Sequence, residues 1–346
     1  MIKRRHVLAG LAGASMPLGR LAWADSGAPS LSLLVAGPDG EQTSRWGNAC
    51  ALAMSGGFPG APDIIPQPAG GLDGVTGANQ LDALVVPDGK TAAILPGAAL
   101  IAWMTGDTRV HFDPTHWAPI LSATNAGVLV VRLGAKAPSV SAVRAFSPLR
   151  LAADSAHSGD LAALLALQCL NIPAAVVFGL RGTDAKTRAF IAGEVDAVFL
   201  SGEGVPEDIA PLSASGGAAV FCTGQLDATG ATVPDPLLPG VPNLASFAGP
   251  CPSPLNAAYE AAAAAARLDF FVVLPRLTDP GAIAAWRQAG QTASASTALV
   301  AAASASSVTL QTAAVTAANL AALSLSASDQ TQLQSFIAQR FGQQAG

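Results

Sequence analysis

The sequence predicts an α/β fold built on mostly parallel sheets flanked by helices. Short runs of apolar and β-branched residues alternate with segments whose apolar positions recur at helical spacing. Strands that are separated by helices form βαβ units, in which the strands lie parallel in one sheet. The runs are apolar on both faces, which is typical of strands covered by helices on both sides.

The apolar runs also give the order of the expected strands. "LSLLVAG" at residues 31–37 is the first, and a polar loop and a helix over residues 45–55 follow it. Residues 150–170 have the pattern of a strand, a polar loop and an amphipathic helix. The other strands are expected within residues 91–95, 126–134, 174–180, 196–200, 217–224 and 267–275.

Length and composition limit the class of protein. The chain has 346 residues, enough for two domains with well-buried cores. It is 51% hydrophobic and 12% charged, with a formal net charge of −5. No run of Lys and Arg follows the first few residues, so we expect no nucleic-acid partner.

The N-terminus has the three parts of a secretory signal. A basic start with Arg4 and Arg5 precedes a mildly apolar stretch, and Ala22-Trp23-Ala24 supplies the small-residue cleavage pattern. The paired arginines followed by Val7 resemble a twin-arginine signal, and an ordinary Sec signal is the alternative. Residues 1–24 are therefore predicted to be a signal peptide, and the mature protein is predicted to be periplasmic.

The segment from Thr292 to Ser328 has no charged side chain and is rich in Ala, Ser and Thr. It is less apolar than a membrane span made of Leu, Val, Ile and Phe. We expect one or two helices of a soluble domain here, with a membrane anchor as the alternative.

The four cysteines contain no CxxC pair. An exported chain can oxidise its cysteines, and Cys222 and Cys251 are the expected pair because both lie in loop-rich sequence. Cys50 and Cys169 lie in apolar helical patterns and are expected to act as small buried hydrophobic residues.

Motifs of common enzyme classes are missing or incomplete. The sequence has no G-x-S-x-G nucleophile elbow and no GxxxxGK[ST] phosphate loop. His111, Asp113 and His116 are a candidate metal group, but Pro114 breaks the segment that would have to align them, so a surface turn is expected. We expect no enzymatic activity, and we assign no catalytic residue, metal site or cofactor.

The glycine cluster in "PAGGLDGVTGANQL" at residues 68–81 lacks dinucleotide-binding spacing, and no convincing strand precedes it. We expect its glycines to let the chain turn sharply and to seat a short helix.

Three polar loops follow predicted strands, at residues 36–44, 154–160 and 201–204. Ligands of open α/β sheets bind outside the carboxyl ends of the strands. Helical patterns follow two of these loops, and helix N-termini offer free N–H groups and partial positive charge to anions. The pattern alone thus predicts an exported α/β protein with several anion-binding loops.

Several motifs follow one another in the order found in a known family. "PAGGLDGVTGANQLDALVVPDGKTAAIL" has the glycine segment, the short helix and the Pro-Asp-Gly turn before a strand, with Lys90 in place of Tyr. "VHFDPTHWAPIL" looks like the family's Phe-Asp-Pro turn and the helix after it. "GEVDAVFL" and "DPLLPGVPNLASF" look like the later Gly-x-Val-Asp strand and the crossover. Together these motifs resemble the Bug-type solute receptors of tripartite tricarboxylate transporters.

The resemblance implies a two-lobed periplasmic-binding-protein (Venus flytrap) fold with a hinge between the lobes. Lobe 1 would comprise residues 25–132 and 241–346, and lobe 2 residues 133–240. It implies a receptor without enzymatic activity that captures a small carboxylate-type solute, either an organic acid or an amino-acid-like ligand. Membrane transporter subunits or a sensor kinase would be its partners, and we expect a monomer. A degenerate receptor that acts as a signalling or structural partner is the alternative, and an exported enzyme is a more distant one.

The resemblance also assigns candidate ligand-binding residues by position. They lie in the loop after the first strand, at the start of the helix after residues 91–95, and in the first loop of lobe 2; the third polar loop adds a serine. The candidates are Gly37, Pro38, Asp39, Gly40, Gln42, Thr43, Pro96, Gly97, Ser155, His157, Ser158, Gly159 and Ser201.

The candidate loops depart from the family pattern in two places. Asp39 and Glu41 add negative charge, which disfavours a bare anion unless they point away or meet an amino group. His157 is an added residue that could bond a carboxylate or sense pH, and a solvent-facing position is the alternative.

Overall fold

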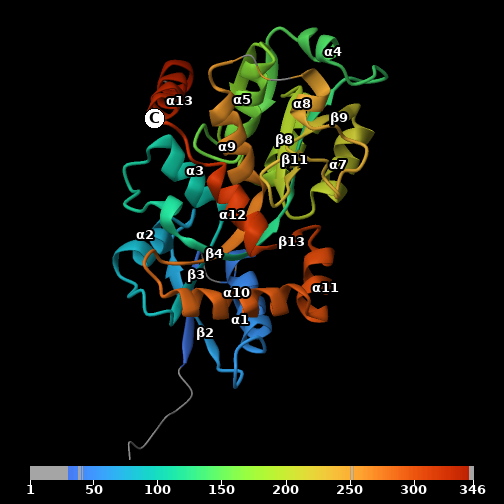
Figure 1. The fold of residues 1–346 in the computed structure, drawn as a ribbon. Helices are drawn as coiled ribbons and strands as arrows, with labels where there is room; N and C mark the ends of the chain where they lie inside the picture. The colour runs from blue at the N-terminus through green and yellow to red at the C-terminus, as the bar shows by residue number, and fades with distance from the viewer. Residues whose placement is uncertain (1–29, 38–39, 41, 250, 252, 343–346) are drawn as a thin grey trace, which may run out of the picture.

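The computed structural model describes residues 30–37, 40, 42–249, 251 and 253–342. The predicted signal peptide lies outside the described residues. The chain forms two lobes, each with its own sheet and helices, and the two lobes lie end to end along the long axis of the molecule (Figure 1). We call them lobe 1, built on a six-stranded sheet, and lobe 2, built on a five-stranded sheet.

The sheet of lobe 1 has the strand order β13-β4-β12-β3-β1-β2. Strand β1 pairs in parallel with β2 and β3, whereas the pairs of β12 with β3, β12 with β4 and β13 with β4 are antiparallel. The strands are β1 (Leu31–Ala36), β2 (Ile64–Gly70), β3 (Thr91–Leu95), β4 (Ala118–Thr124), β12 (Leu268–Leu274) and β13 (Thr309–Thr312).

Helices cover both faces of this sheet because its strands alternate two sets of apolar side chains. Leu33 and Val35 of β1 pack on one face with α1, α10 and α11, and Leu34 and Ala36 pack on the other with α2 and α3. The helices of lobe 1 are α1 (Gln42–Ser55), α2 (Val75–Ala83), α3 (Gly97–Thr105), α10 (Pro280–Ser294), α11 (Thr297–Ala305) and α12 (Ala313–Ala321).

The sheet of lobe 2 has the order β7-β6-β8-β5-β9. Its strands are β5 (Ala126–Arg132), β6 (Leu149–Ala152), β7 (Ala174–Val177), β8 (Ala197–Gly202) and β9 (Gly217–Cys222). The helices α4 (Val140–Arg144), α5 (Leu161–Cys169), α6 (Gly182–Ile191) and α7 (Val205–Ala214) flank it, and the short strands β10 (Gln225–Leu226) and β11 (Thr232–Val233) and the helix α8 (Leu244–Ala248) follow β9.

The two-lobed α/β fold is confirmed, but the sheets are mixed rather than mostly parallel. The antiparallel pairs arise at the strands that carry the chain between lobes. β4 ends lobe 1 at Thr124, and β5 begins in the sheet of lobe 2 at Ala126, where it runs antiparallel to both its neighbours. The chain therefore changes sheets at Asn125, earlier than the boundary predicted after residue 132, and it returns between Cys222 and Leu268.

Two strands differ from the sequence-based expectation. β2 precedes the glycine cluster where no strand was predicted, because Pro66 and Pro68 weaken the strand pattern; prolines are tolerated there since β2 is the edge of the sheet. A helix was predicted after the Phe-Asp-Pro turn. Asp113 instead caps the 3₁₀ turn η1 (Pro114–His116), and the buried strand β4 follows.

The glycine cluster serves the chain path, as predicted. Gly74 has a left-handed conformation and ends the turn before α2. A Cβ on Gly77 would lie 2.4 Å from the Cβ of Ala36, so only glycine lets α2 approach β1 this closely. The cluster thus turns the chain after β2 and seats the short helix α2 against β1.

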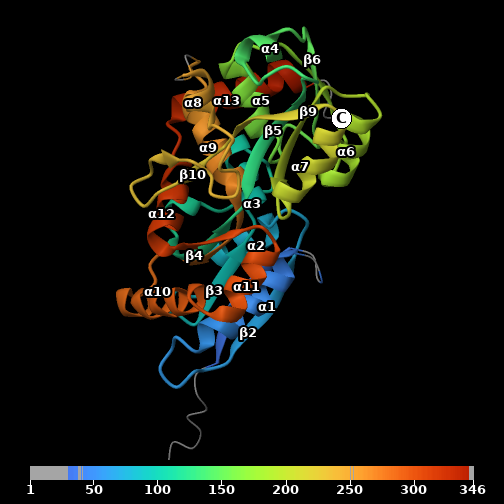
Figure 2. The same cartoon turned by 90° about the vertical axis from the view of Figure 1, so that its right-hand side faces the viewer.

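The helix α9 (Asn256–Arg267) lies between the lobes and packs on α5 of lobe 2 and α3 of lobe 1 (Figure 2). Seven of the buried residues on α9 are alanines, Ala258 and Ala261 to Ala266, and they belong to a hydrophobic cluster that continues through both lobes. The last helix, α13 (Ala327–Phe341), returns to lobe 2, where the ring of Phe341 meets that of Phe178 edge-on at 5.5 Å.

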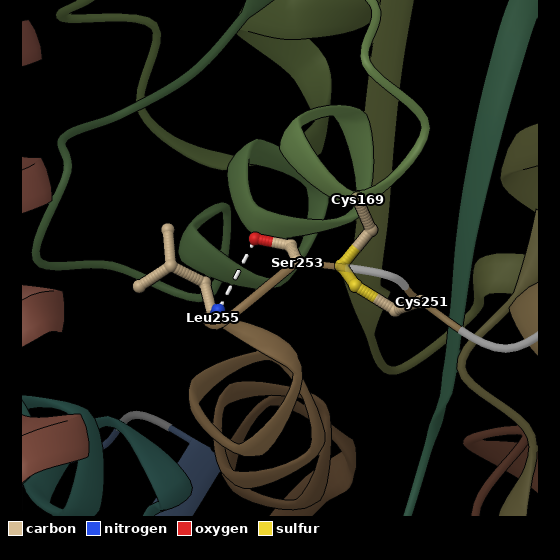
Figure 3. The surroundings of a disulfide bond; sticks show 4 residues. All are labelled: Cys169, Cys251, Ser253 and Leu255. Atoms are coloured by element: carbon tan, nitrogen blue, oxygen red, sulfur yellow. Dashed lines mark hydrogen bonds between the residues drawn. A yellow bond between two sulfur atoms is a disulfide. The ribbon is translucent and has the colours of Figure 1, made fainter.

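The disulfide joins Cys169 and Cys251, so the predicted pair of Cys222 and Cys251 is wrong. Cys169 ends α5, and the chain before α9 passes beside it, where the Ser253 hydroxyl accepts a hydrogen bond from the Leu255 N–H (Figure 3). Cys222 is buried at the end of β9, where its thiol donates to the carbonyl of Val241. Cys50 is a buried free thiol, as expected.

The uncharged segment from Thr292 to Ser328 contains more structure than the expected one or two helices. It holds the end of α10, the helices α11 and α12, and the strand β13, which extends the sheet beside β4. Among the described residues, no helix combines the length and the apolar character that crossing a membrane requires.

Candidate functional site

A small pocket of about 200 Å³ opens between the lobes, where the loops at the ends of β1, β3, β6 and β8 approach one another. It brings together five residues predicted from the sequence: Gln42, Pro96, Gly97, Gly159 and Ser201. It also contains Ala98, Asn125, Gly202, Leu268 and Asp269, which were not predicted.

The N-terminus of α3 forms one wall of this pocket. Pro96 is its N-cap residue and makes no side-chain capping bond, and the first N–H groups of a helix have no partner within it. A Cβ on Gly97 would lie 2.1 Å from the carbonyl oxygen of Ala265 and 2.6 Å from that of Leu268. Glycine at position 97 therefore positions the helix N-terminus directly against the junction of α9 and β12.

Asp269, the second residue of β12, also lines the pocket, and its side chain is buried. Its Oδ1 accepts a hydrogen bond from the Gln42 side chain at 2.5 Å and a long one from the Asn125 amide at 3.5 Å. Its Oδ2 is buried and has no hydrogen-bond partner among the described residues. A single acidic residue inside an apolar strand, "LDFFVVL", is the sequence signal that could have identified it.

The position of Asn125 explains why it escaped sequence-based reasoning. It occupies the single residue between β4 and β5, where the chain first crosses between the lobes, and its N–H donates to the carbonyl of Arg267 beside the return crossing. Its side-chain Oδ1 is buried and, like Asp269 Oδ2, has no partner in the described part of the chain. Two residues that line the pocket thus each have a buried acceptor atom without a partner among the described residues.

The loop after β6 is held by a buried ion pair. Asp160 Oδ1 accepts from Lys186 Nζ at 2.5 Å, and Asp160 Oδ2 accepts from the N–H of Asp154 at 2.8 Å and from the Ser158 hydroxyl at 3.1 Å. The Lys186 ammonium also donates to the carbonyl of Phe199. One carboxylate therefore fixes both ends of the loop that carries the predicted residues.

Three of those loop residues face a second, larger opening of about 500 Å³. Ser155, His157 and Ser158 line it, and it shares Ala98 and Gly159 with the small pocket. Arginines reach it from both lobes, although each is paired with an aspartate: Arg109 with Asp73 and Asp107, and Arg181 with Asp154. The two openings thus adjoin one another, and we call them together the cleft.

Polar contacts join the lobes on one side of the cleft. Glu203, in the loop after β8, accepts hydrogen bonds from Arg45 and from the Trp46 indole of α1, the latter at 2.7 Å. Nearby, the Gly204 N–H donates to the carbonyl of Ser306, and the Ser307 hydroxyl donates to the Glu207 carboxylate. Local sequence pattern contains no signal for these contacts, because each joins residues at least 100 positions apart.

The remaining predicted residues lie at or near the loop after β1. Gly37 pairs with Gly70, Thr43 is buried beneath Gly37, and Gly40 is exposed; none of the three lines either opening. Pro38 and Asp39, together with Glu41, lie outside the described residues.

The pH dependence of stability offers a test of the Asp269 environment. Burial, together with the charge of Glu203, raises the pKa of the Asp269 carboxyl to about 7, despite opposing hydrogen bonds from Gln42 and Asn125 and the charge of Arg45. Since the unfolded value is about 3.9, the folded chain binds more protons between the two values. The free energy of unfolding should therefore fall as pH rises through this window, by up to about 1.4 kcal/mol per pH unit, and level off above about 7.

Denaturant unfolding of the wild type and Asp269→Asn at several pH values measures this effect. Other buried acids, such as Asp235 and Glu260, also have raised pKa values. They are present in both proteins, so the difference between the two curves isolates Asp269. A difference that does not change between pH 4 and 7 would contradict the assignment.

The fold is shared with solved solute-binding proteins. A TctC solute-binding protein from Polaromonas superposes with a TM-score of 0.68 at 16% identity, over 91% of this chain and 100% of that one. MatC from Rhodopseudomonas palustris, solved with bound malate, gives a TM-score of 0.56 at 14% identity over 90% and 99% of the two chains. The periplasmic binding protein BugD gives 0.53 at 14% identity over 91% and 97%.

No family model and no curated protein matches the chain. The structural neighbours nevertheless confirm the resemblance drawn from the sequence at the level of the fold, because TctC and Bug proteins share it over most of the chain.

Proposed function

We propose that this chain is an extracytoplasmic solute-binding receptor of the tripartite tricarboxylate type, which captures a small carboxylate-containing solute between its lobes. One observation carries the proposal: the pocket between the lobes is built from strand-end loops and from the N-terminus of α3. Strand ends of open α/β sheets and helix N-termini are where such folds bind small anionic ligands.

The size of the pocket agrees with a small solute. At about 30 Å³ for one water molecule, 200 Å³ corresponds to about seven waters, which is the size range of a small solute. MatC, which shares the fold, was solved with malate, a solute of this size class. Closure of the two lobes around such a ligand would be the conformational signal that a partner reads.

The partners follow from this role. Membrane transporter subunits or a sensor kinase would recognise the closed form, and the receptor would act as a monomer in the periplasm after export by a twin-arginine-like signal. The comparisons give an enzymatic role no support, since the structural neighbours named above are solute-binding proteins.

Thermal unfolding with a panel of dicarboxylates, hydroxy acids and amino acids tests the proposal. A ligand at 100 times its dissociation constant should stabilise the protein by about 2.7 kcal/mol. Ser201→Trp, which fills the pocket, should abolish the shift, whereas Ser213→Trp on the exposed side of α7 should retain it. A thermal shift of equal size in both variants would show that the pocket is not the binding site.

A degenerate receptor is the second candidate. The contacts of Glu203 with Arg45 and Trp46 join the lobes without any ligand. A receptor with a signalling or structural role could rely on such contacts. Absence of any shift across the panel, with a well-folded wild type, would favour this candidate.

A further inference from the structure

We propose that Glu203, with Arg45 and Trp46 as its partners, is a latch that holds the lobes together beside the small pocket and controls access to it. Glu203 belongs to the loop after β8 in lobe 2. The three hydrogen bonds that its side chain makes in the described chain all run to α1 in lobe 1. The proposal concerns the movement of the lobes, and it does not depend on the identity of the solute.

The bond to Trp46 is the stronger part of the latch. Trp46 is 2% exposed and packs on Phe270 in the core of lobe 1, with 5.0 Å between the ring centroids, so its position is fixed. Its indole N–H donates to the Glu203 carboxylate at 2.7 Å. A hydrogen bond to a charged acceptor is stronger than one between neutral groups, and the packed ring has little freedom left to lose when the bond forms.

Arg45 contributes less to the latch. Its side chain is 57% exposed, whereas that of Glu203 is 21% exposed. An ion pair with one partner so exposed is screened by solvent and has to order a long side chain, so it stabilises little. We therefore expect the indole bond to supply most of the attraction, while the guanidinium balances the charge of a carboxylate that the neighbouring lobe partly buries.

Two further contacts attach the same part of lobe 2 to a second element of lobe 1. The Gly204 N–H donates to the Ser306 carbonyl at 3.1 Å, and the Ser307 hydroxyl donates to both oxygens of the Glu207 carboxylate, at 3.0 and 3.1 Å. Ser306 and Ser307 lie between α11 and β13, and α7 lies above α11 in Figure 1 and in Figure 2. The loop after β8 and the start of α7 thus meet both α1 and the turn after α11.

The latch and the small pocket share the same two supports. Ser201 and Gly202, which directly precede Glu203, line the pocket. Gln42, which begins α1 three residues before Arg45, lines it as well. Movement of Glu203 away from α1 would therefore separate Ser201 from Gln42 and open the pocket.

Hydrogen exchange of the Gly204 amide tests the latch without any solute. This N–H is protected by a carbonyl of the other lobe, so its exchange reports separation of the lobes even when the open form is rare. Glu203→Ala should speed this exchange by about 10–150-fold after correction for the changed neighbour, as expected for loss of a hydrogen bond to a charged group. Arg45→Gln should speed it by about 5-fold or less, because it removes only the exposed ion pair. Glu194→Ala, an exposed position of lobe 2, is the matched control and should exchange as the wild type does.

Distances between spin labels show whether the open form becomes well populated. Leu52→Cys on α1 and Ile191→Cys on α6 place one label on each lobe, at side chains that are 80% and 52% exposed. Cys50 and Cys222 are buried and the other two cysteines form the disulfide, so the labels attach to the introduced residues. The wild type should give one dominant distance, and Glu203→Ala should add a second.

The outcomes separate the parts of the proposal. An unchanged exchange rate at Gly204 in Glu203→Ala, with the far-UV circular dichroism of the wild type, would overturn the latch. An effect of Arg45→Gln as large as that of Glu203→Ala would show that the ion pair, and not the indole bond, holds the lobes, and would overturn the role given to Trp46. Each of these measurements is made without solute, so failure of the latch is distinguishable from failure of the proposed function, which the thermal shift tests.

Discussion

Replacing Asp160 by alanine is expected to lower the free energy of unfolding by about 3–5 kcal/mol, because it leaves the Lys186 ammonium buried without its counter-ion. Asp160 and Lys186 are 2% and 8% exposed, so water cannot replace the lost partner. The loop after β6 also loses the acceptor of the Asp154 N–H and the Ser158 hydroxyl. Urea unfolding monitored by tryptophan fluorescence measures the change.

A double variant separates the ion pair from the loop bonds. Lys186→Met combined with Asp160→Asn removes both charges, so its cost should be smaller than the sum of the two single substitutions. The exposed Asp63→Asn serves as control and should change stability by less than about 0.5 kcal/mol. A loss below about 1 kcal/mol in Asp160→Ala would show that the pair is not buried in solution.

Removing the disulfide by the paired substitution of Cys169 and Cys251 with alanine should cost about 2–5 kcal/mol. The bond closes a loop with a sequence separation of 82 residues, and long closed loops restrict the unfolded chain strongly. A reducing agent should lower the melting temperature of the wild type to about that of the double variant, and it should leave the melting temperature of the double variant unchanged.

Thiol titration in denaturant checks the pairing itself. The oxidised wild type should expose two reactive thiols, from Cys50 and Cys222, and four after reduction. Peptide mapping without reduction should recover the peptide of Cys169 linked to that of Cys251. A linkage between Cys222 and Cys251 would contradict the structure.

Much of the fold could be predicted from the sequence because the central strands are apolar on both faces. The strands β1, β3, β5 and β8 and the loops at their carboxyl ends were located in this way. β2 was not predicted, because its prolines fit a strand only at the edge of a sheet. Edge position is a property of the assembled sheet and cannot be seen in the local sequence. The disulfide pairing was not predicted because Cys169 lies in an apolar helical pattern. Local pattern does not show that the chain carrying Cys251 passes beside the end of this helix.

The candidate site could be predicted only in part, for a similar reason. The loop residues Gln42, Gly97 and Ser201 follow strands in the sequence, and local pattern was enough to locate them. Asn125 and Asp269 are 144 positions apart and meet only because β4 and β12 pair at the crossing between the lobes. Local pattern contains no information on that pairing, so the two acceptors had to come from the tertiary structure.

The alanine face of α9 has a mechanical consequence. Alanine has no side-chain rotamers, so a neighbouring helix can slide along this face without rearranging interlocked side chains. The disulfide ties the chain before α9 to the end of α5, and the surface that α9 shares with lobe 1 is chiefly its contact with α3. That surface includes Gly97, so a displacement of α3 along α9 would reshape the small pocket itself.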